Sequence, residues 1–260
     1  MTSSRILGNR SIQIFMAPTI HAVRHAQGYH NLSVANYQLP DPDLTLHGEE
    51  QCHHLAQHFP YHKPIELLVA SPLRRTIYTT LLGFEPEIKR GLKIITLPEA
   101  QETSDNPCDT GSDVEVLKKE MADKPVDLSL VTEGWNSKKG KWADDAEAIE
   151  ARAKETRKWL QARPEKEIVL VTHGGFLHYF TGDWSDSVKF EAGTGWANTE
   201  YRSYTFKDEK DDNASLVETT ESRERRKGTE KPLSQTEQME LEATQNKKGE
   251  NGGFQLQCKV

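Results

Sequence analysis

Two imidazoles, two guanidinium groups and one amide are the side chains whose types and positions favour phosphate chemistry in this sequence. Arg24 and Arg75 can each present a planar fork of N–H donors to phosphate oxygens. Asn31 can add a hydrogen bond from its amide. His25 and His173 are candidate nucleophiles, since a neutral imidazole can attack phosphorus. The set predicts an anion site that binds a phosphate monoester.

His25 is the better candidate for the nucleophile. The small Ala26 leaves room for a leaving group, and the preceding Arg24 holds the phosphoryl group. In-line transfer to His25 would give a phosphohistidine, which water then hydrolyses. Nearby cations should lower the pKa of His25, because they disfavour a second positive charge. His173 precedes two glycines at a predicted helix start, which suits a charged, electrostatic role toward the phosphate oxygens.

The leaving oxygen of a phosphate ester needs a proton, and the acidic residues after residue 97 are its expected source. Glu102 is the leading candidate for this general acid. Asp105 and Asp109 are competitors for the same role, and the sequence alone leaves the choice open.

Three short apolar runs lead to these basic residues and predict buried strands. The carboxyl ends of parallel strands meet at one edge of an open α/β sheet, where ligands bind. Arg24 with His25, the Arg75 loop and His173 should therefore lie close together. The runs are residues 20–23, 65–70 and 167–171.

Helical spacing of apolar residues predicts helices between and after these strands. Thr45 is the expected N-cap of the first one. The predicted helices are residues 49–59, 75–82, 144–162 and 174–180. Residues 92–97 form another β-like run, and residues 195–206 alternate as an edge strand does.

Residues 98–142 form an insertion rich in acids, lysines, Gly and Pro. The segment is long for a plain connection, which favours a functional lid with short helices. Val114, Leu117 and Met121 support one such helix.

The two ends of the chain differ in composition from its middle. We predict a loosely held arm over residues 1–17, a catalytic domain over residues 18–207, and a disordered, charged tail over residues 208–260. Few large apolar residues in the tail can offset the entropy of folding. A basic cluster at residues 223–227 makes the tail a candidate docking segment for a protein partner and leaves nuclear entry open.

Composition excludes several classes of protein. The net charge of -7 argues against a nucleic-acid binder that works through bulk positive charge. The 3 cysteines include no C-x-x-C pair, so we expect neither a disulfide framework nor a zinc site. His54 and His58 have a spacing that could chelate a metal, but a third ligand is missing and a solvated helix face is the better interpretation. No run is long enough to span a membrane, and we predict a cytoplasmic protein.

Four motifs in this order resemble the histidine phosphatase superfamily, in its phosphoglycerate mutase-like branch. They are Arg24-His25-Ala26, Leu44-Thr45-x-x-Gly48, Ser71-Pro72-Leu73-Arg74-Arg75-Thr76 and Thr172-His173-Gly174-Gly175. Residues 107–112 are similar to a stretch of fungal and plant members that are labelled mutase-like.

The resemblance implies a three-layer α/β/α sandwich with a mostly parallel central sheet. It implies catalysis without a metal or other cofactor, through a phosphohistidine. The resemblance places the nucleophile on His25, the phosphate pocket on Arg24, Asn31, Arg75 and His173, and the acid on Glu102.

Departures from the family pattern favour hydrolysis over isomerisation. Gln27 stands where true mutases carry Glu, and the insertion lacks their Glu-Arg-x-Tyr-Gly run. Ala26 replaces the more usual Gly. The sequence thus predicts a metal-independent phosphomonoesterase that acts on a small phosphorylated metabolite. Two alternatives remain: a mutase-type phosphoryl transfer, and a non-catalytic phosphate-binding or interaction protein.

Overall fold

The computed structural model describes residues 17–183, 194–208, 210–233, 237–238, 241–242 and 244. The predicted N-terminal arm therefore lies outside the described residues, apart from residue 17, and so does the chain after residue 244. No helix in these ranges is both long and apolar enough to cross a membrane. The cytoplasmic location stays a prediction.

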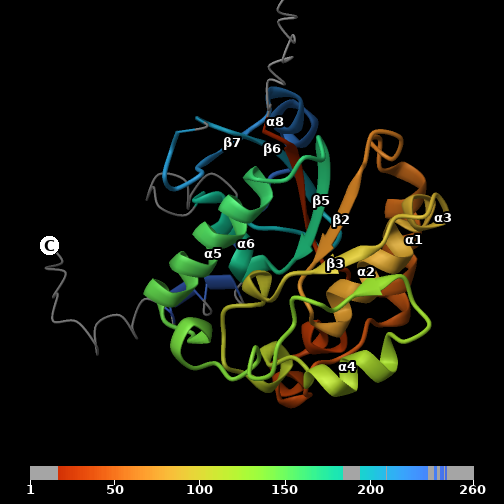
Figure 1. Cartoon of the computed structure of the whole chain (residues 1–260), viewed down its shortest axis with the longest axis vertical. Coiled ribbons are helices and arrows are strands. Elements are labelled where there is room, and N and C mark those ends of the chain that lie inside the picture. The colour runs from red at the N-terminus through yellow and green to blue at the C-terminus, as the bar shows by residue number, and fades with distance from the viewer. Residues whose placement is uncertain are drawn as a thin grey trace, which may run out of the picture.

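A seven-stranded sheet runs through the described ranges in the order β4-β3-β2-β5-β1-β6-β7 (Figure 1). Strands β1 to β5 pair in parallel, and β6 and β7 extend the sheet as antiparallel strands. The mostly parallel sheet is thus confirmed. The strands are β1 (Thr19–Arg24), β2 (Leu67–Ala70), β3 (Ile94–Thr96), β4 (Val126–Asp127), β5 (Glu167–Thr172), β6 (Tyr201–Phe206) and β7 (Leu216–Glu218).

Helices cover both faces of the sheet, as the three-layer prediction requires. Figure 1 shows α5 and α6 on one side and α1, α2 and α3 on the other. The helices are α1 (Leu46–His58), α2 (Arg74–Gly83), α3 (Glu85–Lys89), α4 (Val114–Glu120), α5 (Ala146–Gln161), α6 (Gly174–Thr181) and α8 (Thr220–Arg226). The predicted helices agree with these bounds to within three residues.

The central strands alternate their side chains between two cores, which is why their sequences are apolar throughout. In β5, Ile168 and Leu170 pack into the core under α5 and α6. Val169 and Val171 pack into the opposite core, with residues of α1. Burial of each such side chain contributes about 1.5–3 kcal/mol.

The register of the central strands brings the predicted site residues to one edge. Arg24 of β1 lies opposite Thr172 of β5, and Val171 lies opposite Ala70 of β2. The next residues, His25, Ser71 and His173, therefore leave the sheet side by side.

The start of α1 anchors the loop that follows His25. The side chain of Thr45 accepts a hydrogen bond from Gly48 N at 3.0 Å, which confirms the expected N-cap. Thr45 Oγ1 also donates to Gln27 Oε1 at 2.9 Å. A Cβ on Gly48 would lie 2.1 Å from Gln27 O, so only glycine permits this approach. The Leu44-Thr45-x-x-Gly48 motif thus has a packing role.

The insertion folds into short elements around its own small core. Leu117 of α4, Val131 and Trp135 pack against Leu73, which precedes α2. Strand β4, which the sequence did not predict, pairs with β3 at the sheet edge. Its two residues are too few to show a period.

The expected loss of order after Lys207 is wrong for residues 210–233. Strand β7 pairs with β6, with Val217 opposite Thr205. An ion pair stabilises this segment: both oxygens of Glu218 accept hydrogen bonds from Arg226 of α8, at 2.8 and 2.7 Å. Leu233 and Leu241 join the core under α5 and α6. Composition alone misses such a segment because it buries few residues.

Candidate active site

The structure brings His25, Arg75 and His173 together at the carboxyl ends of β1, β2 and β5. The ring centroids of His25 and His173 lie 5.2 Å apart. Arg75 Nε donates to His25 Nε2 at 3.3 Å. All three side chains are buried. The geometric requirement for a single anion site is therefore met.

The hydrogen bonds of His25 fix its tautomer. Nε2 accepts from Arg75, so the ring proton lies on Nδ1, which donates to Ala26 O at 2.7 Å. Burial, and next the charge of Arg75, hold the pKa of His25 well below its usual value. The sequence had anticipated the effect of cations but not the larger effect of burial. His25 Nε2 is therefore unprotonated at neutral pH, and its electron pair accepts from Arg75.

Arg75 lies in the first turn of α2 and is fully buried. Its Nη1 donates to Cys108 O at 2.5 Å and its Nη2 donates to Asp109 Oδ1 at 2.9 Å. Both acceptors belong to the insertion, on the 3-10 helix Pro107–Asp109. The insertion therefore completes the surroundings of this guanidinium.

His173 lies at the N-cap of α6, and its Nε2 makes a 2.8 Å hydrogen bond with Ser71 Oγ. Its Nδ1 is buried and has no hydrogen-bond partner within the described ranges. Burial, followed by the charge of Arg75, holds the pKa of His173 well below its usual value. The expected charged role is thus not the state of His173 in this structure, where the imidazole is neutral.

Arg24 approaches the site from β1. Its Nη1 donates to Trp196 O and lies 3.8 Å from Glu237 Oε1. Its Nε is buried and has no partner among the described residues. A Cβ on Gly174 would lie 3.3 Å from this Nε, which explains the glycine after His173. Arg24 thus keeps one donor free beside the start of α6.

The side-chain amide of Asn31 makes its hydrogen bonds to groups of its own loop. Its Nδ2 makes a 3.1 Å hydrogen bond with His30 Nε2, and its Oδ1 accepts from Gly28 N at 3.0 Å. His30, which the sequence did not single out, lies 5.3 Å from His25 between ring centroids. Burial, followed by Arg75 and Arg24, lowers the pKa of His30 to about 2. The loop thus lines the site with a neutral imidazole.

Glu102 is buried beside the start of α6. Its Oε1 accepts from Phe176 N and Thr103 N at 2.9 Å, and its Oε2 accepts from Gly175 N at 3.3 Å. Burial, and then the charge of Asp109, raise the pKa of Glu102. Of its two competitors, Asp105 is exposed, and Asp109 pairs with Arg75. Glu102 is the carboxyl group best placed to hold a proton here.

Two cations fix the segment that carries Glu102. Arg152 Nη1 of α5 donates to Glu99 O at 2.8 Å and to Gln101 O at 2.9 Å. Lys138 Nζ donates to Glu102 O at 3.0 Å. Burial, and then Arg152, lower the pKa of Lys138 to about 8. The backbone of this segment is therefore held from two sides.

Sequence reasoning missed several neighbours of the site. Ser71 was quoted only as part of a motif, and Asp109 was considered only as an acid. No spacing rule shows that they contact His173 and Arg75. Glu237 comes from the segment expected to lack order. The sequence signal for this contact was weak. Leu233 and Leu241 lie four residues before and after Glu237, a helical spacing, and the structure buries all three.

Within the described ranges, no group of His, Cys, Asp and Glu side chains could hold a metal ion. His54 and His58 are exposed on α1, and His58 Nδ1 donates to His54 O at 2.8 Å.

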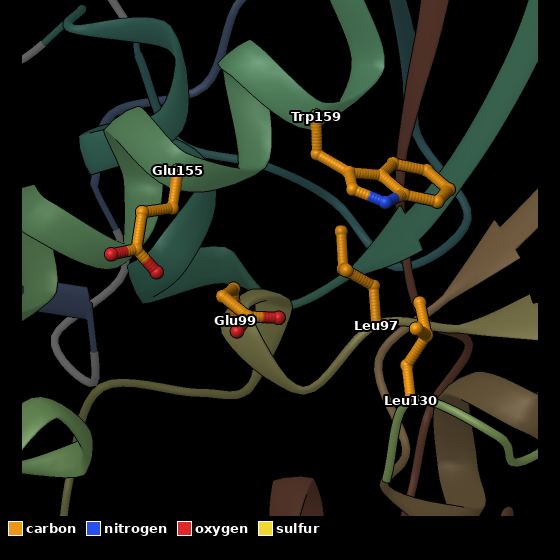
Figure 2. Close-up of a pocket in the computed structure, with 5 residues that line it drawn as sticks. All are labelled: Leu97, Glu99, Leu130, Glu155 and Trp159. Atoms are coloured by element: carbon orange, nitrogen blue, oxygen red, sulfur yellow. The ribbon is translucent and has the colours of Figure 1, made fainter. Parts of the chain in front are cut away.

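A cavity of about 240 Å³ lies away from the anion site, between α5 and the segment before Glu102 (Figure 2). Figure 2 shows Trp159 and Glu155 of α5 facing this space. None of its lining residues is a predicted site residue, and we assign it no role in the chemistry. The lining residues are Leu97, Glu99, Leu130, Glu155 and Trp159.

Comparison with known proteins identifies the family. Residues 20–219 match the family described as "Histidine phosphatase superfamily (branch 1)". A "Phosphoglycerate mutase-like protein" of Arabidopsis thaliana is 30% identical over 241 residues, covering 78% of this chain and 89% of its own length. A "Probable phosphatase" of Schizosaccharomyces pombe is 27% identical over 165 residues, covering 62% of this chain and 76% of its own length.

A solved structure shares the fold at lower identity. It is a mutant phosphoserine phosphatase from Entamoeba histolytica in complex with phosphoserine, with a TM-score of 0.50 and 16% identity, covering 78% of this chain and 95% of that chain. The family matches most of the chain, and a relative that is 30% identical is covered over 89% of its length. The chain therefore belongs to the histidine phosphatase superfamily, branch 1, and is an enzyme of the phosphatase type.

Proposed function

We propose that this phosphatase hydrolyses a small phosphorylated metabolite without a metal, through a phosphohistidine on His25. One observation carries the proposal: the unprotonated Nε2 of His25 is buried in direct contact with the guanidinium of Arg75, at 3.3 Å. A phosphate bound there would take over the Arg75 donor, which would release the Nε2 electron pair for attack beside a permanent positive charge.

The unused donors around His25 suit the oxygens of that phosphate. Arg24 Nε and His173 Nδ1 are buried without partners in the described part of the chain. Nδ1 of the neutral His173 carries the ring proton in the tautomer in which Ser71 Oγ donates to Nε2. A buried N–H without an acceptor costs about 1–3 kcal/mol, and a bound phosphate would supply the missing acceptors. The dianion would also raise the pKa of His173, so that this imidazole could become charged on binding.

The reaction has two steps in which atoms and charges balance. First, His25 Nε2 attacks phosphorus, and the bond to the leaving oxygen breaks as that oxygen takes the proton of Glu102. Then water attacks the phosphohistidine, the P–N bond breaks, and the Glu102 carboxylate takes a proton from the water. Inorganic phosphate and the free enzyme result.

Hydrolysis is favoured over mutase-type transfer. Gln27, which stands where mutases carry Glu, bonds through its side chain to Thr45 at the start of α1. A mutase must keep the phosphoryl group for a second hydroxyl, which requires a pocket that excludes water. Because a relative in Arabidopsis thaliana is named mutase-like, mutase-type phosphoryl transfer should be assayed directly.

The test is a panel of phosphorylated metabolites assayed for inorganic phosphate and for isomerised product. His25→Ala should reduce turnover on the order of 10⁴-fold or more and abolish trapping of labelled phosphate on the protein. His53→Ala, at an exposed position of α1, is the matched control and should leave both unchanged. Phosphate release by the His25 variant at the wild-type rate would refute the proposal. Isomerisation with little phosphate release would instead identify a mutase.

A further inference from the structure

The carboxylate of Asp109 meets the guanidinium that contacts the proposed nucleophile. We propose that Asp109 is a positioning residue for the phosphatase reaction, holding Arg75 against His25. The inference rests on the proposed function, in which His25 is the nucleophile and Glu102 is the acid.

The contacts of Arg75 leave its guanidinium only one orientation. Asp109 Oδ1 accepts from Nη2 at 2.9 Å and Cys108 O accepts from Nη1 at 2.5 Å. These two bonds direct Nε at His25 Nε2, 3.3 Å away. The side chains of Arg75 and Asp109 are 0% and 3% exposed, so water does not compete for the pair. Removing the charge at residue 109 should therefore change the position of Arg75 and the pKa of His25.

The second oxygen of Asp109 is also held. Ser104 Oγ donates to Asp109 Oδ2 at 2.6 Å. The loop that carries Asp109 is tied to the start of α2 through Asp41. The Asp41 side chain accepts hydrogen bonds from Arg74 N at 3.0 Å and from Ser112 N at 2.9 Å. The same backbone frame thus sets the positions of Asp109 and Arg75.

Asp109 also acts on Glu102 through its charge. The charge of Asp109 raises the pKa of Glu102, after burial, while Arg75 and the backbone N–H groups of Thr103 and Phe176 oppose the rise. Lys138, of the insertion, interacts with both carboxylates. A neighbouring negative charge favours the protonated acid that the first step needs.

The groups that face His25 determine how its pKa would change if Asp109 were neutralised. Arg75 of α2, Arg24 of β1 and His30 of the following loop all lower its pKa, and the bond to Ala26 O opposes them. Neutralising Asp109 leaves the charge of Arg75 uncompensated, so the pKa of His25 falls further. The pKa of Glu102 falls as well, because it loses its anionic neighbour.

Asp109→Asn tests the proposal, because asparagine keeps the size and one acceptor but loses the charge. In a profile of kcat/KM against pH, the acid limb reports protonation of His25 and the basic limb reports loss of the Glu102 proton. Both limbs should move to lower pH, each on the order of half a unit or more. The maximal kcat should fall roughly 10-fold or more. Asp123→Asn, at an exposed position of the same insertion, should leave the profile unchanged.

A second variant separates charge from position. Asp109→Glu keeps the charge on a longer side chain, so both limbs should stay while kcat falls. This variant carries the test if the asparagine variant is unfolded by its thermal melting curve. Unmoved limbs in Asp109→Asn, whether kcat falls or not, or shifted limbs in Asp109→Glu, would overturn the proposal. Phosphate trapping on His25 should persist in both variants, which separates this failure from a failure of the proposed function.

Discussion

Arg24 and Arg75 flank His25, and each faces a buried carboxylate from a distant part of the chain. Asp109 of the insertion meets Arg75 at 2.9 Å, whereas Glu237 of the C-terminal segment stays 3.8 Å from Arg24. Arg75 uses all three nitrogens on protein acceptors, while Arg24 keeps Nε unpartnered within the described ranges. On the proposed function, Arg75 would hold the nucleophile His25 in position, and Arg24 would keep a donor for the phosphate.

The two carboxylates also differ in what else they neutralise. Glu237 Oε1 accepts from Trp196 N at 3.1 Å and lies 3.8 Å from His178 Nε2. Burial alone would disfavour the His178 cation, yet Asp183 and Glu237 raise the pKa of His178 to about 9. Glu237 therefore keeps a cationic neighbour without Arg24. Among the described residues, Asp109 forms its ion pair with Arg75.

Among the variants that test this contrast, a change of Arg75 should have the largest effect. Arg75→Met leaves the buried Asp109 without its counter-ion, which should lower the free energy of unfolding by about 3–5 kcal/mol. Turnover should also fall by roughly 10²–10³-fold, because a preorganised cation is lost. Denaturant unfolding and phosphate release measure the two effects.

The control for this prediction is the double variant Arg75→Met with Asp109→Asn. It removes the unpaired charge and should recover part of the lost stability but not the activity. Equal stability of the single variant and the wild type would show that water or another cation compensates Asp109, and would remove the contrast with Arg24.

The half of the site built from strand ends could be predicted from sequence. Each apolar run is short and a basic residue follows it within a few positions, and parallel pairing brings such strand ends to one edge. His25, Arg75 and His173 needed no further knowledge of the fold. Their protonation states did need it, since burial dominates the pKa of both histidines.

The carboxylate half of the site could not be predicted in the same way. The pairing of Asp109 with Arg75 depends on how an irregular loop folds around Asp41, and no periodicity encodes that path. Glu237, the carboxylate nearest to Arg24, could not be predicted for another reason. Glu237 lies in a charged segment whose composition indicates disorder, although its few apolar residues are buried.

Arg24→Met should have the second largest effect, mainly on binding. Losing a charge-assisted donor to phosphate should lower kcat/KM by roughly 10–100-fold and weaken inhibition by inorganic phosphate to a similar degree. The fall in stability should be smaller than in Arg75→Met, because Glu237 keeps His178 and Trp196 N. Phosphate inhibition constants and urea unfolding test both statements. If Arg24→Met lost as much stability as Arg75→Met, the two arginines would contribute equally to stability and the contrast between them would be wrong.

Glu237→Gln should have the smallest effect, and its sign decides what the C-terminal segment does to Arg24. Glutamine still accepts from Trp196 N but holds the Arg24 guanidinium less firmly, so KM should rise about 3-fold with kcat unchanged, as expected when uniform binding is lost. Glu242→Gln, at an exposed position of the same segment, is the matched control. A fall in KM would mean instead that the Glu237 carboxylate competes with the phosphate for Arg24. In that case a protein carboxylate would hold Arg24 away from the phosphate in the free enzyme, as protein acceptors hold Arg75, and the contrast between the two arginines would be lost.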